Sequence, residues 1–353
     1  MKAIVLVGGS GTRLRPLTST TPKSLLPILN RPLISYLLAN LRKHGVEEVI
    51  FAASAGDLRL ERALDQDLGL GLKTSFAYET TPLGSGLAVK QAAEASNVSS
   101  TFLVCNGDII TDLDLTGMLA VHRSRQSVVT ISLTKVDDPS SFGVVAMDES
   151  HRITRFVEKP PKEEAPSQYV NSGTWIFEPQ VLDYIPSEPL DGSLERRAFP
   201  AIIESPQVVQ GFPSGAYFMD VGTPERYLQV HRDLLNGACS SLCAPSTSSQ
   251  SFGADVAGLV GDQAAVAASA CVARSSVVGS QCAVGEGAVI EGSVLWDGVR
   301  VGDRAIVHKS IVGRGCKIGA GSLVSGCVLG DGVVVKPGSV LKGERLAADD
   351  SIS

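Results

Sequence analysis

The sequence predicts an α/β domain followed by a C-terminal β-helix, and three observations lead to that fold class. Short β-branched runs alternate with amphipathic helical stretches from residue 1 to about residue 235. A glycine-rich turn directly follows the first of these runs. From about residue 259 to residue 343, aliphatic residues recur every five or six positions among glycines, which is typical of a β-solenoid.

The first 235 residues contain the elements of a sheet covered by helices. β-branched and aromatic runs predict strands over residues 2–7, 47–53, 73–79, 101–108, 127–136, 142–148, 153–159 and 171–177. Apolar residues at helical spacing predict helices over residues 33–45, 58–66 and 84–96. Because the two kinds of element alternate, we expect a parallel sheet with helices on both faces. A closing helix is expected over residues 224–237, with Thr223 as its N-cap.

The remaining residues divide into a linker, a repeat region and a tail. Residues 1–235 are expected to form the α/β domain, and the Ser-, Ala- and Gly-rich residues 236–258 to form a linker. Residues 259–343 are expected to form the β-helix, and residues 344–353 a tail. Three strands should complete one coil, and each should place one aliphatic or aromatic residue in the core. The expected inward residues are Val260, Val266, Val272, Val278, Val284, Ile290, Trp296, Val301, Val307, Val312, Ile318, Val324, Leu329, Val335 and Val340.

Composition excludes several classes of protein. A net charge of -6 argues against nucleic acid as the main partner, because duplex binding requires a basic surface. No apolar stretch approaches 18 residues, so we expect no membrane span, and the N-terminal run is too short for a signal peptide. The seven cysteines are scattered and odd in number, which indicates reduced thiols and a cytoplasmic protein.

The opening stretch "KAIVLVGGSGTRLRPLTSTTPK" is typical of a phosphate-binding loop at the end of a strand. It is not a P-loop, because Thr12 and Arg13 follow Gly11 where Lys and Ser or Thr are required. It is not a dinucleotide fingerprint, because Leu14 occupies the third glycine position. We expect the glycines to surround a nucleotide's phosphates while Arg13 and Lys23 neutralise their charge.

These residues resemble the signature of the nucleoside-diphosphate-sugar pyrophosphorylases, which are sugar-1-phosphate nucleotidyltransferases. The resemblance continues in order with "PLGSGLA", "NGD" at 106–108, "FGVV" at 142–145, "FVEKP" at 156–160, "NSGTWIF" at 171–177 and "FMDVGTPERYL" at 218–228. It covers essentially the whole chain. It implies a Rossmann-like, mixed-sheet nucleotidyltransferase domain followed by a left-handed β-helix of hexapeptide repeats. Within the family, "ETTPLG", "RFVEKP" and "SVLWDGV" look most like mannose-1-phosphate guanylyltransferases.

The resemblance also implies a set of site residues. Catalytic residues are expected to be Arg13, Lys23, Asp108, Lys159 and Asp220. The nucleotide is expected to contact Val7, Gly8, Gly9, Ser10, Gly11, Thr12, Arg13, Lys23, Glu79, Pro82, Gly84, Asn106, Gly107 and Asp108. The sugar phosphate is expected to contact Gly143, Glu158, Lys159, Asn171, Gly173 and Asp220. Asp108 and Asp220 each follow an apolar run, and the resemblance implies that they hold Mg²⁺.

The resemblance leaves both substrates open. Glu79 favours GTP, because a carboxylate can pair with the two adjacent donors of guanine but not with the carbonyls of uracil or thymine. If Glu79 instead faces solvent, backbone groups near Leu83 to Ser85 would read the base. Mannose 1-phosphate is the favoured acceptor, which would give GDP-mannose and pyrophosphate. Guanylyl transfer to a heptose 1-phosphate and uridylyl or thymidylyl transfer to glucose 1-phosphate are alternatives.

Two further roles have sequence requirements that can be compared with this chain. A regulatory subunit that binds nucleotide sugars without turnover would usually lack a signature-loop residue or a metal carboxylate, whereas Arg13, Lys23, Asp108 and Asp220 are all present. Acyl transfer by the β-helix would require a general base, which is usually a histidine. The repeat region contains a single histidine, His308. Homo-oligomerisation is the expected role of the β-helix. Arg15 receives no assigned role, and Lys90 is expected to be a solvated helix position.

Overall fold

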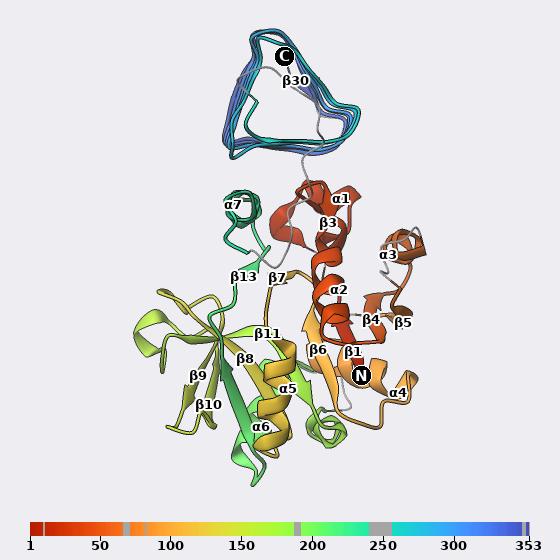
Figure 1. Cartoon of the computed structure of the whole chain (residues 1–353), viewed down its shortest axis with the longest axis vertical. Coiled ribbons are helices and arrows are strands. Elements are labelled where there is room, and N and C mark those ends of the chain that lie inside the picture. The colour runs from red at the N-terminus through yellow and green to blue at the C-terminus, as the bar shows by residue number, and fades with distance from the viewer. Residues whose placement is uncertain are drawn as a thin grey trace. The chain divides into compact units, whose positions relative to one another are not determined.

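The computed structural model describes residues 1–9, 11–65, 71–81, 83–186, 192–239, 256–347 and the backbone of 351–352 (Figure 1). The chain divides into two compact units. The first unit comprises residues 1–9 and 34–218, and the second comprises residues 10–33 and 219–353. Most of the predicted linker, residues 240–255, lies outside the described residues.

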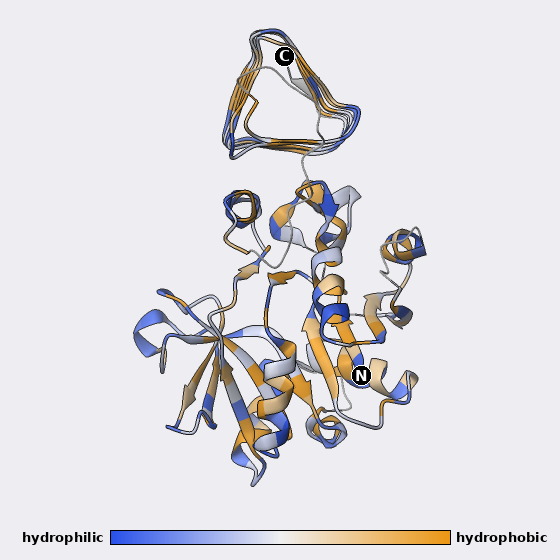
Figure 2. Cartoon of the chain, viewed as in Figure 1, coloured by the Kyte–Doolittle hydropathy of each residue, from blue (hydrophilic) through white to orange (hydrophobic). Residues whose placement is uncertain are grey.

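Four parallel strands form one side of the sheet in the first unit, in the spatial order β6-β1-β4-β5. Their bounds are β1 Lys2–Leu6, β4 Glu48–Ser54, β5 Lys73–Glu79 and β6 Phe102–Asn106. All four were predicted from their β-branched runs, and Figure 2 shows that the central ones are strongly hydrophobic. Such continuous apolar runs are expected where both faces of a parallel sheet are buried.

The other side of the sheet is mostly antiparallel. It contains β8 Val129–Lys135, β9 Gly143–Met147, β10 Ile153–Glu158, β11 Tyr169–Phe177 and β12 Val209–Pro213. β11 runs antiparallel to β6, β8 and β9, β9 is antiparallel to β10, and β12 is parallel to β8. The expectation of a wholly parallel sheet is therefore wrong for these strands, whereas the mixed sheet that the family resemblance implied is confirmed.

Helices cover this sheet and complete its core. The predicted helices are α2 Leu33–Lys43, α3 Arg59–Ala63 and α4 Ser85–Ala95, and α4 packs against β1, β4 and β5. The sequence reading missed α5 Leu115–Ser124, α6 Phe199–Glu204, β7 Ile109–Thr111 and β12. Shorter helical segments lie at η4 Lys162–Glu164, η5 Pro179–Tyr184 and η6 Leu194–Ala198.

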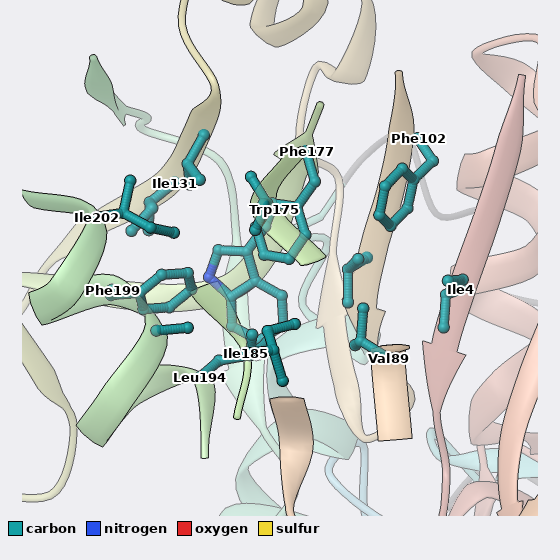
Figure 3. Packing of buried hydrophobic residues seen from close by; sticks show 14 of the residues in the cluster. Ile4, Val89, Phe102, Ile131, Trp175, Phe177, Ile185, Leu194, Phe199 and Ile202 are labelled. Carbon is teal, nitrogen blue, oxygen red and sulfur yellow. The ribbon is translucent and has the colours of Figure 1, made fainter. Parts of the chain in front are cut away.

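An aromatic cluster occupies the centre of the first unit's core (Figure 3). Trp175 is completely buried, and its ring centroid lies 5.9 Å from that of Phe199 and 6.4 Å from that of Phe177. Phe102 meets Phe177 edge-to-face at 5.8 Å. Trp175 is therefore a core residue, as expected for an aromatic side chain in an apolar strand.

The second unit begins with residues 11–32, which we call the signature segment. Its elements are η1 Thr12–Leu14, α1 Leu17–Thr20, η2 Lys23–Leu25, β2 Pro27–Ile28 and β3 Arg31–Pro32. After β13, Phe218–Asp220, the closing helix α7 spans Pro224–Leu235. The Thr223 side chain caps α7 by accepting from the Arg226 backbone N–H at 3.3 Å, so the predicted N-cap is confirmed.

Three parallel sheets form the β-helix, and Figure 1 shows them as the sides of a triangle. The first sheet contains β14 Leu259–Val260, β17 Val277–Val278, β20 Val294–Leu295, β23 Ile311–Val312, β26 Val328–Leu329 and β29 Arg345–Leu346. The second contains β15 Ala265–Val266, β18 Ala283–Val284, β21 Arg300–Val301, β24 Lys317–Ile318, β27 Val334–Val335 and β30 Ser351–Ile352. The third contains β16 Cys271–Val272, β19 Val289–Glu291, β22 Ile306–His308, β25 Leu323–Ser325 and β28 Val340–Lys342.

The predicted inward residues form the β-helix core, with two corrections. Leu295, not Trp296, occupies the core position that stacks on Val278. Leu341, not Val340, stacks on Val324, and Val340 is 63% exposed. Both corrections concern the place of a five-residue step, because a one-residue shift turns a side chain to the other face. The step from Ile290 to Leu295 has five residues and comes one strand earlier than predicted. The step from Val335 to Leu341 has six residues, and the five-residue step to Leu346 comes one strand later.

A serine ladder connects successive coils inside the β-helix. Ser276, Ser293 and Ser310 are buried, and each hydroxyl donates to a backbone carbonyl, those of Ile290, Val307 and Val324. Ser293 Oγ also accepts from the backbone N–H of Ser310, 17 residues later, at 3.0 Å. Ser310 Oγ does the same for Cys327. These hydrogen bonds satisfy the buried hydroxyls and fix the register of the coils.

Two expectations from composition can be compared with the described residues. Six of the seven cysteines are described, and each is a free thiol. Within the described part of the chain, no helix is long and apolar enough to cross a membrane.

His231 generates a prediction about acid stability. It is completely buried on α7, its Nδ1 accepts from the Leu29 backbone N–H at 3.3 Å, and burial lowers the pKa of His231 to about 3. The unfolded chain binds a proton near pH 6.5, whereas the folded chain does not until about pH 3, so stability declines as pH falls below 6.5. Between pH 7 and pH 5 this group alone should reduce the free energy of unfolding by about 2 kcal/mol.

Urea unfolding of wild type and His231→Gln at both pH values measures this effect. The glutamine can still accept from Leu29 but does not titrate, so the variant should lose about 2 kcal/mol less than wild type on acidification. His151→Gln is the matched control, because His151 is exposed. An equal pH dependence in wild type and His231→Gln would contradict the prediction.

Candidate functional site

Residues at the end of β1 lie beside the ends of two neighbouring strands. The Val7 N–H donates to the Ala52 carbonyl at 3.0 Å, and Ser54 Oγ donates to the Gly8 carbonyl at 3.1 Å. A Cβ on Gly8 would lie 3.4 Å from Glu79 Oε1 and 3.5 Å from Ser54 Oγ. The backbone at Gly8 therefore lies in van der Waals range of two polar side chains. A Cβ on Gly9 would meet no atom within 4 Å.

Glu79 is the last residue of β5 and is held in a defined position. It pairs in register with Ser54, and its Oε2 accepts from the Leu83 backbone N–H at 3.1 Å. Burial raises the pKa of Glu79 above its ordinary value, and the hydrogen bond from Leu83 partly opposes that shift. Glu79 is thus neither a freely solvated strand end nor a core residue: it is a half-buried carboxylate at the edge of the sheet.

The end of β6 brings a second group of predicted residues together. The Gly107 N–H donates to the Leu6 carbonyl at 2.9 Å, and a Cβ on Gly107 would lie only 2.6 Å from Val7 Cγ1. Gly173 has a φ of 72°, and a Cβ there would lie 2.8 Å from Asn106 Nδ2. Asn171 Oδ1 accepts from the Gly173 N–H at 2.9 Å. Glycine is therefore required at both positions, for close approach and for conformation.

Asp108 follows Asn106 and Gly107 in the turn between β6 and β7, and it is half-buried. It therefore lies at the same end of the sheet as the Gly8 backbone, because β6 is the parallel neighbour of β1. Its carboxylate lies two residues after the end of the buried strand β6.

Gly143, Glu158 and Lys159 form a third group. Gly143 and Glu158 are register partners, and a Cβ on Gly143 would lie 3.0 Å from Glu158 Oε2. Lys159 Nζ lies 3.3 Å from Glu158 Oε1, and Lys159 itself has a φ of 49°. Burial raises the pKa of Glu158, whereas Lys159 opposes this shift and Glu195 adds to it.

Glu195 connects this third group with the start of α4. Its Oε2 accepts from Ser85 Oγ at 2.7 Å and from Ser193 Oγ at 2.9 Å. Gly84, the residue before α4, has a φ of 81°, and a Cβ there would lie 3.1 Å from the Gly192 carbonyl carbon. Sequence reasoning missed Glu195, because nothing in its neighbourhood in the sequence indicates that it reaches Ser85.

The remaining predicted residues belong to the second unit. Gly11 has a φ of 58°, its carbonyl accepts from Thr18 Oγ1 at 2.8 Å, and a Cβ there would lie 2.9 Å from Thr18 Cγ2. Thr12 and Arg13 follow in η1 and are exposed. Gly11 therefore takes a left-handed backbone conformation at the start of the signature segment, and Arg13 is exposed.

Asp220 lies among three cationic side chains. Arg226 Nη1 lies 3.0 Å and Lys23 Nζ 3.7 Å from its carboxylate oxygens. A Cβ on Gly222 would lie 2.9 Å from Arg13 Nη2 and 3.1 Å from Asp220 Oδ1. The structure thus brings Asp220 close to Arg13 and Lys23, which precede it by about 200 residues in the sequence.

Arg226 and Ser54 are the other polar residues that sequence reasoning missed. Arg226 occupies the first turn of α7, three residues after the Thr223 cap, which places it beside Asp220. The sequence could have indicated this contact, because Arg226 lies in the first turn of a capped helix that begins shortly after Asp220. Ser54 ends β4, and its pairing with Glu79 becomes visible only once the strand register is known.

Several predictions remain outside these groups. Ser10 and Pro82 are not among the described residues. Asp108 belongs to the first unit and Asp220 to the second. The described residues contain no cluster of three or more His, Cys, Asp or Glu side chains that could hold a metal. Arg15 is exposed, whereas Lys90, expected to be solvated, is half-buried and donates to the Ile185 carbonyl at 3.1 Å, which ties α4 to η5.

Comparisons with known proteins agree with this arrangement. The family model described as "Nucleotidyl transferase" matches residues 2–237, and the model described as "EIF2B subunit epsilon LbH domain" matches residues 247–341. Mannose-1-phosphate guanylyltransferase from Mycobacterium tuberculosis is 37% identical over 300 residues, which is 85% of this chain and 80% of that protein.

Two other proteins show the breadth of the family. UTP–glucose-1-phosphate uridylyltransferase from Synechocystis is 31% identical, over 86% of this chain and 85% of that protein. The crystal structure of HddC from Yersinia pseudotuberculosis complexed with GMP-PN is 29% identical with a TM-score of 0.56, over 66% of this chain and 99% of that one. The chain therefore belongs to the nucleotidyl transferase family, as a sugar-1-phosphate nucleotidyltransferase with a C-terminal left-handed β-helix.

Proposed function

We propose that this protein transfers a guanylyl group from GTP to mannose 1-phosphate, giving GDP-mannose and pyrophosphate. The position of Glu79 carries the proposal for guanine. Its half-buried carboxylate lies beside Gly8 at the edge of the sheet and is fixed by the Leu83 N–H. The 37% identity to a protein named mannose-1-phosphate guanylyltransferase supports both the base and the sugar.

Guanine presents an N1–H and an exocyclic amine side by side. A carboxylate can accept from both donors, and such charge-assisted hydrogen bonds are about twice as strong as neutral ones. Against uracil or thymine the same carboxylate would face carbonyl oxygens, and two opposed acceptors are costly when buried. The sequence left open whether the Glu79 carboxylate or backbone groups near Leu83 read the base. We propose that both take part, since the Leu83 N–H donates to Glu79.

The transfer itself requires positioning and charge neutralisation rather than a protein nucleophile. An oxygen of the sugar 1-phosphate forms a bond to the α-phosphorus, the bond from that phosphorus to the bridging oxygen breaks, and pyrophosphate leaves in line. Both reactants are polyanions, so positive side chains must offset their repulsion. Arg13, Lys23 and Arg226, gathered around Asp220, are the residues that we assign to the nucleotide's phosphates.

Asp220 has a second role in this arrangement. By pairing with Lys23 and Arg226 it fixes the direction of both cations before substrate binds. Preorganised charges of this kind do not have to reorient as the reaction proceeds, which is the reason they lower the barrier.

The third group of residues is assigned to the sugar phosphate. Lys159 is 58% exposed and can reach a phosphate, whereas Glu158 is only 16% exposed and can accept from sugar hydroxyls. Gly143 leaves space beside Glu158, and Asn171 and Gly173 provide an amide and a backbone without a Cβ.

The two carboxylates fit Mg²⁺ in their chemistry. Mg²⁺ binds one or two carboxylates and completes its octahedral shell with water and substrate phosphates, and it does not need a cluster of protein ligands. We assign Asp108 and Asp220 as its protein ligands. When bound, Mg²⁺ neutralises charge on the reacting phosphates.

A homo-oligomer formed through the β-helix is also proposed. On the outer face of its third sheet, Val289, Ile306, Leu323 and Val340 are stacked register partners. Ile306 is 43% and Val340 63% exposed. A continuous outward aliphatic row is typical of a surface that another subunit covers.

The test of the proposed reaction is a substrate panel. Purified protein with Mg²⁺ is incubated with each pairing of GTP, UTP, dTTP or ATP with mannose, glucose or heptose 1-phosphate, and pyrophosphate release is measured. The GTP and mannose 1-phosphate pair should be fastest. A preference for UTP or dTTP would overturn the guanine assignment, and no release with any pair would favour a nucleotide-sugar-sensing subunit.

Asp108→Asn and Asp220→Asn should each lower kcat by roughly 100-fold or more, because each removes a charge where transition-state charge develops. Pyrophosphate release at saturating substrates measures the effect. Asp183→Asn, at an exposed carboxylate of η5, is the control and should retain wild-type turnover. Near-normal rates in both site variants would refute the metal assignment.

Lys23→Ala should mainly raise KM for GTP, and Lys159→Ala mainly KM for the sugar 1-phosphate. Each lysine forms a charge-assisted contact, whose loss should change its own KM by about 10-fold. Initial rates with one substrate varied and the other saturating separate the two constants. Lys43→Ala, at an exposed lysine of α2, serves as control. An equal rise in KM for GTP and KM for the sugar 1-phosphate in either site variant would contradict the assignment of each lysine to one substrate.

Glu79→Gln should lower kcat/KM for GTP by about 10-fold or more, because a charge-assisted hydrogen bond is lost. In wild type, lowering the pH should weaken GTP binding through the raised pKa of Glu79, because the protonated carboxyl accepts less well. This pH dependence should be absent in Glu79→Gln. The exposed Glu47→Gln is the control, and a Glu79→Gln profile that matches wild type would exclude base reading by Glu79.

A further inference from the structure

Five residues connect the first sheet of the β-helix with α7 and the signature segment, all within the second unit. We call Tyr227, Trp296, Arg314, Asp331 and Arg345 the brace. Trp296 directly follows β20, and Arg314 and Asp331 lie two residues after the ends of β23 and β26; these three strands are stacked neighbours in that sheet. They therefore lie at the same corner of successive coils.

Trp296 and Tyr227 form the buried part of the brace. Trp296 is 1% exposed although its ring lies outside the β-helix core, where Leu295 takes the inward position. Its Nε1–H donates to Tyr227 Oη at 3.0 Å, and the Tyr227 hydroxyl in turn donates to the Pro27 carbonyl. A chain of two hydrogen bonds thus connects the β-helix, through α7, to the signature segment four residues after Lys23.

Arg314 and Asp331 contact the two threonines that precede Lys23 in the signature segment. Arg314 lies over the Trp296 ring, 4.9 Å from its centroid, and its Nη1 donates to Thr21 Oγ1 at 2.8 Å. Thr20 Oγ1 donates to Asp331 Oδ2 at 2.8 Å. Asp331 Oδ1 accepts from the Arg314 backbone N–H, which fixes the carboxylate.

Arg345 contacts the signature segment at Arg13. Its Nη1 donates to the Arg13 backbone carbonyl at 3.2 Å. Hydrogen bonds to side chains of the β-helix or of α7 therefore hold the segment on both sides of Lys23 and at Arg13. They involve the hydroxyls of Thr20 and Thr21 and the backbone carbonyls of Pro27 and Arg13. Within the signature segment, Thr18 and Gly11 supply only a local hydrogen bond.

We propose that the β-helix is a positioning element for the nucleotide: the brace fixes Arg13 and Lys23 in the conformation that binds the triphosphate. The inference rests on the proposed function, because it takes both cations as phosphate ligands. Cationic ligands must be held within a fraction of an ångström to act, and the hydrogen bonds of the brace hold the backbone and the threonine side chains around both cations. Arg314 and Arg345 are positioning residues, since they act through Lys23 and Arg13 and not on the substrate.

A purely structural role predicts a different outcome from a positioning role. If the brace only stabilised the fold, its removal would lower the unfolding temperature and affect both substrates alike. If it positions Arg13 and Lys23, its removal should raise KM for the nucleotide while KM for the sugar 1-phosphate stays unchanged, because Lys159 lies in the first unit.

The experiment compares Arg314→Ala, Arg314→Lys and Arg345→Ala with Arg300→Ala in the full-length chain. Arg300 is an exposed arginine of the second sheet and is the matched control. The nucleotide that wild type uses best in the substrate panel is varied. We expect KM for it to rise about 10-fold in the two alanine variants, with partial rescue by lysine, and KM for the sugar 1-phosphate to change less than 2-fold.

Thr21→Val keeps the inference testable if Arg314→Ala does not fold. Valine has nearly the shape of threonine but cannot accept from Arg314, so this variant should also raise KM for the nucleotide. The double variant Thr21→Val with Arg314→Ala should be no worse than Arg314→Ala alone, because the two share one interaction. Circular dichroism melting of every variant identifies those that fold.

The outcomes separate the two proposals. Folded brace variants whose nucleotide KM equals that of Arg300→Ala, or whose two KM values rise equally, would overturn the positioning role. Wild-type protein without activity on any pair in the panel would overturn the proposed function instead. A nucleotide other than GTP as the best substrate would change the base assignment and leave the brace test in force.

Discussion

The parallel run β6-β1-β4-β5 is the constraint on which the first unit depends. Parallel strands all end at the same edge of a sheet, so residues that follow different strands become neighbours there. Gly8, Ser54, Glu79 and Asn106 come from four such ends, and none lies within 20 residues of another in the sequence. Their hydrogen bonds and close approaches follow from the register of the strands.

Elements with a strong local signal could be predicted from the sequence, and elements defined by pairing could not. The apolar runs at β1, β4, β5 and β6 and the period of the β-helix are local signals, because each is visible within a short stretch of the sequence. The direction of β11 relative to β6 is not local, because an apolar strand has the same composition either way. The choice between Leu295 and Trp296 depended on which of two steps had five residues.

The candidate site shows the same division. Gly8, Gly9 and Gly11 and the cations Arg13 and Lys23 could be picked from the sequence, because their types match a phosphate-binding loop. Their partners could not: Arg226 reaches Asp220 through a helix cap, and Glu195 reaches Ser85 across about 110 residues. The compact units join residues 10–33 to residues 219–353, and such a joining of distant segments cannot be seen in composition.

The serine ladder has a consequence for how the length of this chain can vary in evolution. Ser293, Ser310 and the Cys327 N–H are joined at intervals of 17 residues, so each coil offers the next one an equivalent set of donors and acceptors. Duplication or loss of one whole coil would therefore leave every remaining inward side chain in place. An insertion of another size within a strand would turn the following aliphatic residues toward water. Repeat number can thus drift among descendants of this sequence while the fold of each coil persists.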